Sequence, residues 1–314
     1  MKLGVLIVLF HPSDAELGRL QAVQRACDML IVVDNTPAPD LRAQALATRD
    51  GFTLLHRGNV GGIAGAYNAG LEKLFPHVDA VALFDQDSTI PEAFFPTMRH
   101  ICAELPEAFL AGPRIFEENG QFFLATVEMR TNGYVIWPFR VNPNVTVERC
   151  AFLISSGCVI SREAFRVLGQ FDEALFIDHV DVEYSLRAQA LKVPRYLVSS
   201  LALPHRIGAR QPHRFGPFTL MASNQSWLRR YYNTRNGVRL TLQYGLRFPF
   251  VILLFTWLQL RQIVEVALCE RDKRGKFKSM LYGIVDGWLG RLGPIEKTRP
   301  CLAARANPQN PSNG

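Results

Sequence analysis

The sequence predicts an α/β fold: a mostly parallel sheet with helices on both of its faces, followed by a helical C-terminal extension. Between residues 4 and 203, short apolar runs typical of buried strands alternate with segments whose apolar residues recur at helical spacing. Such alternation is typical of parallel strands connected by covering helices. From Trp227 onward the alternation stops, and mixed basic and aromatic residues give way to a long apolar run.

The individual elements follow in order along the chain. Apolar runs predict strands at residues 4–10, 29–33, 52–55, 81–84 and 196–203. Helical spacing and capping residues predict helices at 15–27, 40–47, 161–169 and 180–190, with a further helix in the glycine-rich segment 58–74. Because ligands bind such sheets at the carboxyl ends of the strands, polar residues that follow the strands are candidate site residues.

Composition limits the class of protein. The chain has 314 residues, 48% of them hydrophobic, which is enough for one large or two modest domains. Its net charge is +7, and the excess of Lys and Arg in the C-terminal third indicates an anionic partner there. The six cysteines include no Cys-x-x-Cys pair, which disfavours a zinc site or a disulfide framework and favours a reducing cytosol. The apolar N-terminal run is short and lacks a cleavage site, so it predicts a strand and not a signal peptide.

The C-terminal region is apolar at 248–260 and strongly basic at 271–278. No stretch reaches the roughly 18 uncharged apolar residues that are expected of a membrane-spanning helix. Such segments suit helices that lie in an anionic membrane interface, and the alternative is helices that pack on the core. Few aromatics lie among the basic residues, which disfavours nucleic acid. The predicted organisation is an α/β domain at 1–225, an amphipathic helical region at 226–306 and a disordered tail at 307–314.

Two carboxylates, Asp85 and Asp87, follow the apolar run at 81–84, and His205 follows the strand at 196–203. Carboxylate oxygens hold hard cations such as Mg²⁺ or Mn²⁺, which neutralise phosphate oxygens. A neutral imidazole can complete such a site. The three residues are therefore candidate metal ligands. The alternatives are an acidic turn that caps a helix and a surface histidine.

Asp34 and Asn59 also lie just after predicted strands. Asn59 opens the glycine-rich segment 58–70, which lacks the Gly-Lys-Ser/Thr ending of a Walker A loop. We expect a helix whose small residues let a ligand or a strand approach closely, with Asn59 as its cap and Asn68 reaching the ligand. The alternative is a helix of small residues that only packs.

Four titratable groups, Asp178, His179, Asp181 and Glu183, lie close together beside apolar residues. Buried or crowded carboxylates have raised pKa values and can accept protons. Asp178 and Asp181 are three residues apart near the start of the predicted helix at 180–190, so both can lie on one face. Both are candidate catalytic bases. The alternative is that these acids complement a helix N-terminus.

Four stretches in this order resemble glycosyltransferase family 2 and, within it, the bacterial rhamnosyltransferases of surface-polysaccharide assembly. They are Val-Asp-Asn-Thr at 33–36, Gly-Asn-Val-Gly-Gly-Ile-Ala-Gly-Ala-Tyr-Asn-Ala-Gly at 58–70, Phe-Asp-Gln-Asp-Ser at 84–88 and Phe-Ile-Asp-His-Val-Asp-Val-Glu-Tyr-Ser-Leu-Arg at 176–187. The resemblance extends from residue 1 to about residue 240. It implies a GT-A fold, which is a Rossmann-like sheet, together with a nucleotide-sugar donor, a divalent metal and inversion at the anomeric carbon.

Matched by motif, the resemblance implies a role for each candidate on the donor side. Asp34 would contact the base or ribose of the nucleotide, and Asp85 would lie near the nucleotide. Asp87 would bind the metal that bridges the diphosphate, and His205 would contact the metal or the diphosphate. Arg235, with its neighbour Asn236, would make a later donor-side contact.

On the acceptor side, the resemblance matches Asp181 to the family's catalytic carboxylate. The family motif often reads Glu-Asp, whereas Val180 precedes Asp181 here, which leaves Asp178 as a rival base.

The implied function is inverting transfer of L-rhamnose from dTDP-L-rhamnose to a hydroxyl of a lipid-linked saccharide, in the biosynthesis of bacterial O-antigen or capsule. The implied location is cytoplasmic and peripheral on the inner face of the cell membrane. The alternatives are a family 2 transferase for a UDP- or GDP-linked sugar and a non-catalytic membrane-bound scaffold of the same fold. A nucleotidyltransferase is disfavoured, because residues 4–13 contain no basic glycine-rich loop.

Overall fold

The structure is a computed structural model. It describes residues 1–117, 122–124, 126–129, 135–139, 146–205, 211–215 and 218–303. Its internal contacts divide the chain into two compact units. The first unit is Met1–Met129, Val135–Asp172 and Val180–His205, and the second is Arg130–Tyr134, Glu173–His179 and Arg206–Gly314.

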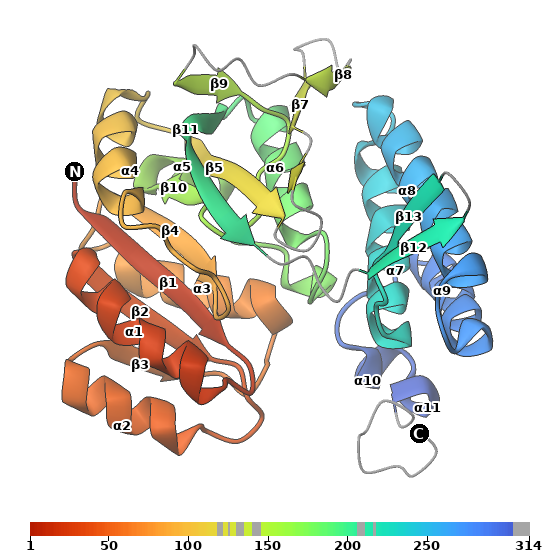
Figure 1. Ribbon diagram of the computed structural model, residues 1–314, viewed down its shortest axis with the longest axis horizontal. Helices are drawn as coiled ribbons and strands as arrows, with labels where there is room; N and C mark the ends of the chain where they lie inside the picture. The colour runs from red at the N-terminus through yellow and green to blue at the C-terminus, as the bar shows by residue number, and fades with distance from the viewer. Residues whose placement is uncertain are drawn as a thin grey trace. The chain divides into compact units, whose positions relative to one another are not determined.

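Among the described residues of the first unit, nine strands form one sheet (Figure 1). Their order is β3–β2–β1–β4–β10–β5–β11–β9, with β6 paired to β5. The strands are β1 (Leu3–Leu9), β2 (Met29–Asp34), β3 (Thr53–His56), β4 (Ala80–Asp85), β5 (Leu110–Glu117), β6 (Phe122–Phe123), β9 (Val147–Arg149), β10 (Val159–Ser161) and β11 (Arg195–His205). Two more strands, β7 (Thr126–Met129) and β8 (Val135–Phe139), pair with each other. The predicted α/β class is confirmed.

The direction of the strands decides which residues can share a site. β2 and β4 are parallel to β1, and β3 is parallel to β2. β10 is antiparallel to both β4 and β5, so β5 runs in the direction of β4, and β11 is parallel to β5. The carboxyl ends of β1 to β5 and β11 therefore face the same edge of the sheet.

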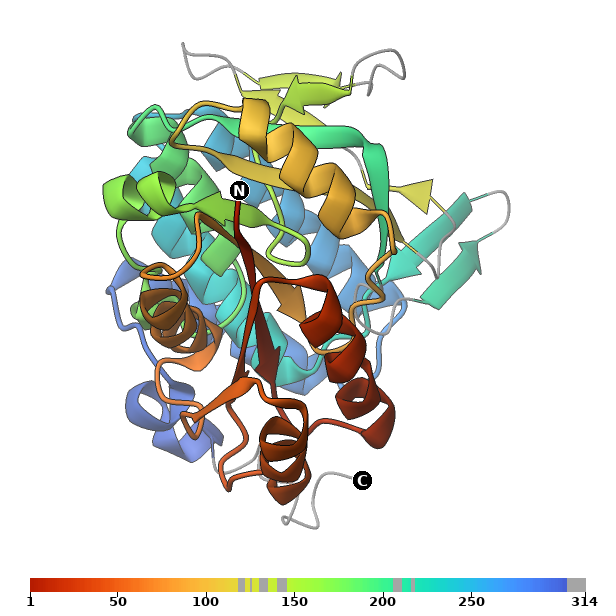
Figure 2. The same ribbon diagram turned by 90° about the vertical axis from the view of Figure 1, so that its left-hand side faces the viewer.

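Helices cover both faces of this sheet (Figures 1 and 2). One face packs in a single core cluster with α1 (Asp14–Ala26), α2 (Leu41–Asp50) and α4 (Phe94–Glu104). The other face packs against α3 (Gly62–Leu74), α5 (Arg162–Leu168) and α6 (Val180–Ala190). Side chains alternate along β4, so Asp85 shares the side of Leu83, which lines a cavity together with residues of α6.

The first two helices begin where the sequence predicts. Ser13 accepts a hydrogen bond from the N–H of Glu16, and the Glu16 carboxylate accepts one from the N–H of Ser13, which completes a capping box. Asp40 caps α2 by accepting from the N–H groups of Arg42 and Ala43.

The glycine-rich helix α3 starts differently from the prediction. Its N-cap is Gly61, with φ of 74°, and no side chain caps it, so the prediction that Asn59 caps this helix is wrong. The left-handed backbone at Gly61 sets the entry to the helix, which glycine allows at no steric cost. A Cβ added at Gly70 would lie 2.2 Å from the Leu6 side chain. The small residues of α3 therefore let a strand approach closely, which was one of the two expectations.

The second unit is mainly helical. Its described elements are a 3₁₀ turn η1 (Glu173–Leu175), the hairpin β12 (Gln211–Phe215) and β13 (Phe218–Ala222), and helices α7 (Trp227–Tyr244), α8 (Phe250–Leu268), α9 (Lys273–Trp288), α10 (Ile295–Thr298) and α11 (Pro300–Ala303). A Cβ added at Gly283 or Gly287 of α9 would lie within 3 Å of the carbonyl oxygen of Tyr231 or Arg235. These glycines allow α9 to pack directly on the backbone of α7. The predicted disordered tail, 307–314, lies outside the described residues.

In the described part of the chain, α8 is long and apolar enough to cross a membrane. It has 19 residues and a mean hydropathy of 1.6. The expectation from the sequence concerned a run of uncharged apolar residues, whereas α8 reaches this length with charged residues included. The helix continues past Leu260 through Arg261 and Glu265, polar residues that ended the apolar run in the sequence. Length and composition alone are weak grounds for a span, because core helices meet the same criteria.

Candidate active site

Asp85, Asp87 and His205 come together in the first unit. Each offers one ligand atom, and these atoms lie within 4.8 Å of one another. Asp85 ends β4 and His205 ends β11, two strands that run toward the same edge of the sheet. Asp87 is exposed and the other two are half-buried. Two carboxylates and an imidazole are a donor set suited to a divalent cation that keeps positions open for substrate oxygens.

The loop that carries Asp87 is fixed by hydrogen bonds on both sides. The Gln86 amide accepts from the N–H of Phe10 at 2.6 Å and donates to the Phe10 carbonyl at 3.3 Å. The hydroxyls of Ser88 and Ser156 lie 2.6 Å apart. The Asp87 backbone is therefore positioned before any ligand binds.

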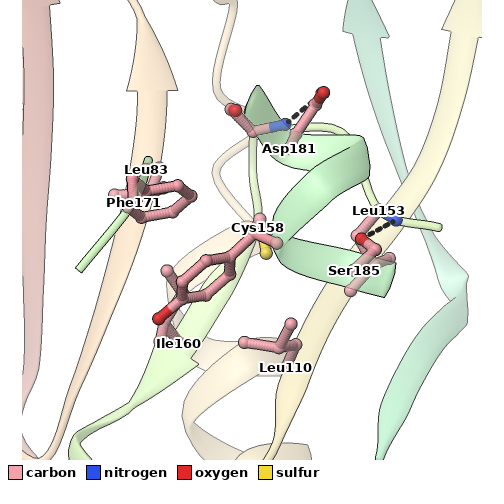
Figure 3. A pocket seen from close by; sticks show the side chains of 10 residues that line it. Leu83, Leu110, Leu153, Cys158, Ile160, Phe171, Asp181 and Ser185 are labelled. Atoms are coloured by element: carbon pink, nitrogen blue, oxygen red, sulfur yellow. Dashed lines mark hydrogen bonds between the residues drawn. The ribbon is translucent and has the colours of Figure 1, made fainter. Parts of the chain in front are cut away.

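The turn that contains Ser156 also contacts Asp181. Leu83 of β4 donates to the carbonyl of Cys158 and accepts from the N–H of Gly157, at 2.9 and 2.7 Å. The N–H of Ser155 donates to Asp181 Oδ2 at 3.3 Å (Figure 3). The turn thus lies between the strand that ends at Asp85 and the helix that carries Asp181.

Tyr67 of α3 interacts with both groups of carboxylates, and no motif in the sequence singles it out. Its side chain is buried and hydrogen-bonded to Ser155. Burial, and then the negative charges of Asp85 and Asp181, raise the pKa of the Tyr67 hydroxyl well above its ordinary value of 10. The candidate metal ligand Asp85 and the candidate base Asp181 therefore both lie close enough to Tyr67 to act on its hydroxyl.

A small cavity lies beside Asp181 (Figure 3). Its volume of about 10 Å³ is room for roughly one water molecule. Ser185, one helical turn after Asp181, accepts from the N–H of Leu153 at 3.3 Å. Burial raises the pKa of the Cys158 thiol, which also lines the cavity, so this thiol stays protonated and is a poor nucleophile.

Asp178, the alternative candidate base, forms an ion pair with Arg229. It lies in the second unit, and its two carboxylate oxygens accept from Arg229 at 2.6 and 2.8 Å. The Asn236 amide donates to the carbonyls of Leu175, Ile177 and Asp178. This segment has positive φ at Asp178 and needs such support. These contacts give Asp178 a structural role.

The Asp34 carboxylate is hydrogen-bonded to backbone groups of its own loop. It is buried at the end of β2, and its two carboxylate oxygens accept from the N–H groups of Thr36 and Asp40, each at 2.9 Å. Asn59 has a positive φ, and its carbonyl accepts from the N–H of Gly62. Both residues lie after strands that end at the site edge, and their contact with a nucleotide stays a prediction.

Two other predicted donor contacts lie in the interior. The Asn68 amide donates to the Phe171 carbonyl at 3.0 Å and accepts from the Phe171 N–H at 2.8 Å, so it joins α3 to a segment 103 residues away. Arg235 is fully buried in the second unit and donates to the carbonyls of Ala174, Leu175 and Gly293. Burial lowers the pKa of this guanidinium. The geometry gives both side chains a structural role, because their polar atoms face backbone groups.

Comparisons with known proteins agree with this fold. The dTDP-rhamnosyl transferase RfbF of Shigella flexneri is 28% identical over 298 residues, which cover 92% of this chain and 96% of that protein. The crystal structure of GalNAc-T7 with UDP, GalNAc and Mn²⁺ superimposes with a TM-score of 0.53 at 14% identity, over 77% of this chain. The match spans about half of that chain, 47%. A mycobacterial protein of known structure has a TM-score of 0.44 at 12% identity, over 71% of this chain and 83% of that one. No protein-family model matches the chain.

The sheet, the edge on which the acids gather and these similarities together define a glycosyltransferase of the GT-A class. Within that class the chain is similar to the dTDP-rhamnosyl transferase of Shigella flexneri over nearly the whole length of both proteins.

Proposed function

We propose that this glycosyltransferase moves L-rhamnose from dTDP-L-rhamnose to a hydroxyl of a lipid-linked saccharide, with inversion, in the biosynthesis of bacterial O-antigen or capsule. The observation that carries the proposal is the convergence of Asp85, Asp87 and His205 beside a turn that also holds Asp181. The choice of rhamnose is supported by the relative named as a dTDP-rhamnosyl transferase.

Asp85, Asp87 and His205 would hold Mg²⁺ or Mn²⁺. The fit is supported by the donor set, which is rich in carboxylate oxygen, and by the 4.8 Å limit on the separation of the ligand atoms. When bound, such an ion neutralises the charge of the departing nucleoside diphosphate.

Asp181 is the proposed base. The acceptor hydroxyl gives its proton to the Asp181 carboxylate as its oxygen bonds to the anomeric carbon, and the bond from that carbon to the diphosphate oxygen breaks. Attack from the face opposite the diphosphate converts a β-L-rhamnosyl donor into an α-L-rhamnosyl product, through a transition state with oxocarbenium character. Ser155 orients the base through its N–H, and protonated Tyr67 supports Ser155.

We place the reaction on the cytoplasmic side of the cell membrane. All six cysteines lie in the described part of the chain and none forms a disulfide there, which fits a reducing compartment. A lipid-linked acceptor would be presented at the inner face of the membrane.

A donor screen tests the proposal directly. The purified protein is incubated with Mn²⁺ or Mg²⁺, a set of synthetic lipid-linked saccharides and either dTDP-L-rhamnose or UDP- and GDP-linked sugars, and the products are identified by mass and anomeric configuration. We expect an α-L-rhamnosyl product from dTDP-L-rhamnose. If the protein transfers sugar only from a UDP- or GDP-linked donor, the proposal that the donor sugar is rhamnose is wrong, and the protein is still a glycosyltransferase.

Titration with dTDP and with UDP in the presence of Mn²⁺ is independent of the acceptor. We expect dTDP to bind more tightly than UDP. A protein that binds neither nucleotide would be a non-catalytic scaffold with this fold.

A further inference from the structure

Apolar side chains are exposed along one side of helix α8. Leu253, Trp257, Leu260, Val264 and Leu268 recur at intervals of three or four residues and are between 44% and 68% exposed. This spacing places them in one stripe on the helix. The buried apolar residues of α8 lie at other positions on the helix and pack within the second unit. Within the described part of the chain, these side chains therefore form an exposed apolar stripe.

Helix α9 carries a second stripe. Leu281, Ile284, Val285, Trp288 and Leu289 are exposed, Trp288 by 65%. The opposite side of α9 packs on α7 through its glycines. Only residues 269–272 separate α8 from α9, so the two helices form an antiparallel hairpin with two exposed apolar stripes.

Cations lie at both ends of this hairpin. Arg271, Lys273 and Arg274 are exposed at the connection between the helices, and Arg247 and Arg291 are exposed at the opposite end. Residues 211–303 contain 15 Lys and Arg against 5 Asp and Glu. In the described part of this stretch, Asp272 and Glu296 are the exposed acids. An apolar surface with cationic ends and few anions matches an anionic lipid surface.

We infer that α8 and α9 lie in the plane of an anionic lipid surface, with both stripes in the acyl boundary and the cations among the headgroups. The inference concerns attachment and holds for any donor or acceptor. A transmembrane α8 is disfavoured because Glu265 of this helix is buried and paired with Arg230, a contact that spanning would break. A second copy is disfavoured because symmetric contact through the same face would bring cationic ends together with few acids to pair them.

Vesicle sedimentation tests the inference with the full-length protein. The two probes are vesicles of phosphatidylcholine and vesicles of phosphatidylcholine mixed with phosphatidylglycerol. We expect binding to the anionic vesicles that weakens as salt is raised. The double variant Lys273→Gln/Arg274→Gln should bind them roughly thirtyfold more weakly, because each cation near such a surface contributes about a fivefold factor. The double variant Leu253→Ser/Trp257→Ser should lose at least about tenfold.

The matched control is Leu41→Ser, which removes a 75% exposed leucine from α2 of the first unit and should leave vesicle binding unchanged. The thermal midpoint of each variant separates loss of binding from loss of folding, and the Lys273/Arg274 variant alters no buried side chain. Binding that resists high salt and alkaline carbonate would overturn the inference in favour of a spanning helix. The inference would be overturned in favour of a second copy if the unaltered protein binds neither kind of vesicle and is a dimer, while the Leu253/Trp257 variant is a monomer.

Discussion

At the scale of single residues, partners decide what each aspartate can do. Asp34 accepts from two N–H groups of its own loop, and Asp178 accepts from Arg229. Asp181 lies beside a small cavity, next to a turn that reaches Ser88. Asp85 and Asp87 gather with a histidine. An aspartate carboxylate therefore supports a loop at Asp34 and an ion pair at Asp178, and we propose that it accepts a proton at Asp181 and binds a metal at Asp85 and Asp87.

Replacing Asp181 by Asn should remove the base and keep the shape of the site. We expect kcat to fall by roughly a hundredfold to ten-thousandfold, the usual contribution of a general base, while the Kd for dTDP stays unchanged. Steady-state kinetics and calorimetric titration measure the two quantities. The matched variant is Asp178→Asn, which should retain far more turnover. A dead Asp178→Asn enzyme beside an active Asp181→Asn enzyme would reverse the assignment.

Replacing Asp87 by Ala should weaken the metal-dependent part of dTDP binding. We expect at least roughly a tenfold loss of Mn²⁺ affinity, because even loss of an outer partner of a metal ligand costs that much. Titration with Mn²⁺, followed by dTDP titration with and without chelator, measures it. Glu92→Gln, outside the cluster, is the control. If the unaltered protein binds dTDP equally well with and without chelator, the proposed metal-binding role of Asp87 is contradicted.

Replacing Tyr67 by Phe should keep the buried ring and remove the hydroxyl that supports Ser155. The net worth of one such hydrogen bond predicts a fall in kcat of about tenfold, with little change in the KM for donor. Because burial raises the pKa of this hydroxyl above 10, Tyr67 stays protonated below pH 10. Its ionisation therefore does not change the reaction rate in that range. The pH profiles of both enzymes should therefore keep the same shape up to pH 10. An alkaline limb that disappears in Tyr67→Phe would show that Tyr67 titrates during turnover.

At the scale of elements, the glycines of α3 show how a sequence motif allows close packing beside the candidate site. A Cβ added at Gly65 would lie 2.4 Å from the carbonyl oxygen of Val60, so the loop that precedes α3 can fold back onto the helix. Helix α7 has a comparable role in the second unit, where Arg229, Arg235 and Asn236 bind the segment 173–179. That segment leads directly into α6 and Asp181.

Gly65→Ala and Gly18→Ala should therefore change stability in opposite directions. Gly65→Ala should cost about 1–3 kcal/mol, because the new methyl group collides with backbone that cannot rotate away. Gly18 lies within α1 with nothing within 4 Å of an added Cβ, so Gly18→Ala should stabilise by about 1 kcal/mol through helix propensity. Urea denaturation measures both. Equal effects of the two changes would contradict the close approach at Gly65.

At the scale of the whole molecule, charge is distributed unevenly between surface and interior. The second unit combines exposed cations with a buried network in which Arg230 pairs with Glu265 and Glu270, and Lys276 pairs with Glu270. These residues come from α7, α8, α9 and the connection before α9, so the network ties the helices together. The charges of this network are paired in the interior, whereas other cations of the unit are exposed at its surface.

Glu270→Gln should destabilise the second unit by about 3–5 kcal/mol, because it leaves two buried cations with one carboxylate fewer. Chemical denaturation followed by tryptophan fluorescence measures this loss, since Trp227, Trp257 and Trp288 all lie in this unit. The control is Glu163→Gln, which breaks an exposed pair with Arg166 and should leave the denaturation midpoint in place. A midpoint unchanged by Glu270→Gln would mean that the network adds nothing to stability.

The sequence by itself determined the alternation of strands and helices, the edge of the sheet at which ligands bind, and the grouping of Asp85, Asp87 and His205 at that edge. These features follow from apolar periodicity and from residues adjacent to strand ends, which are local in the chain. Only the tertiary structure decided that Tyr67 joins the two sets of acids, that Asn68 and Arg235 are bound to backbone, and that Asp178 is paired with Arg229. Those roles depend on partners that lie far away in the sequence, up to 103 residues for Asn68, and hydrophobic periodicity carries no information about such pairs.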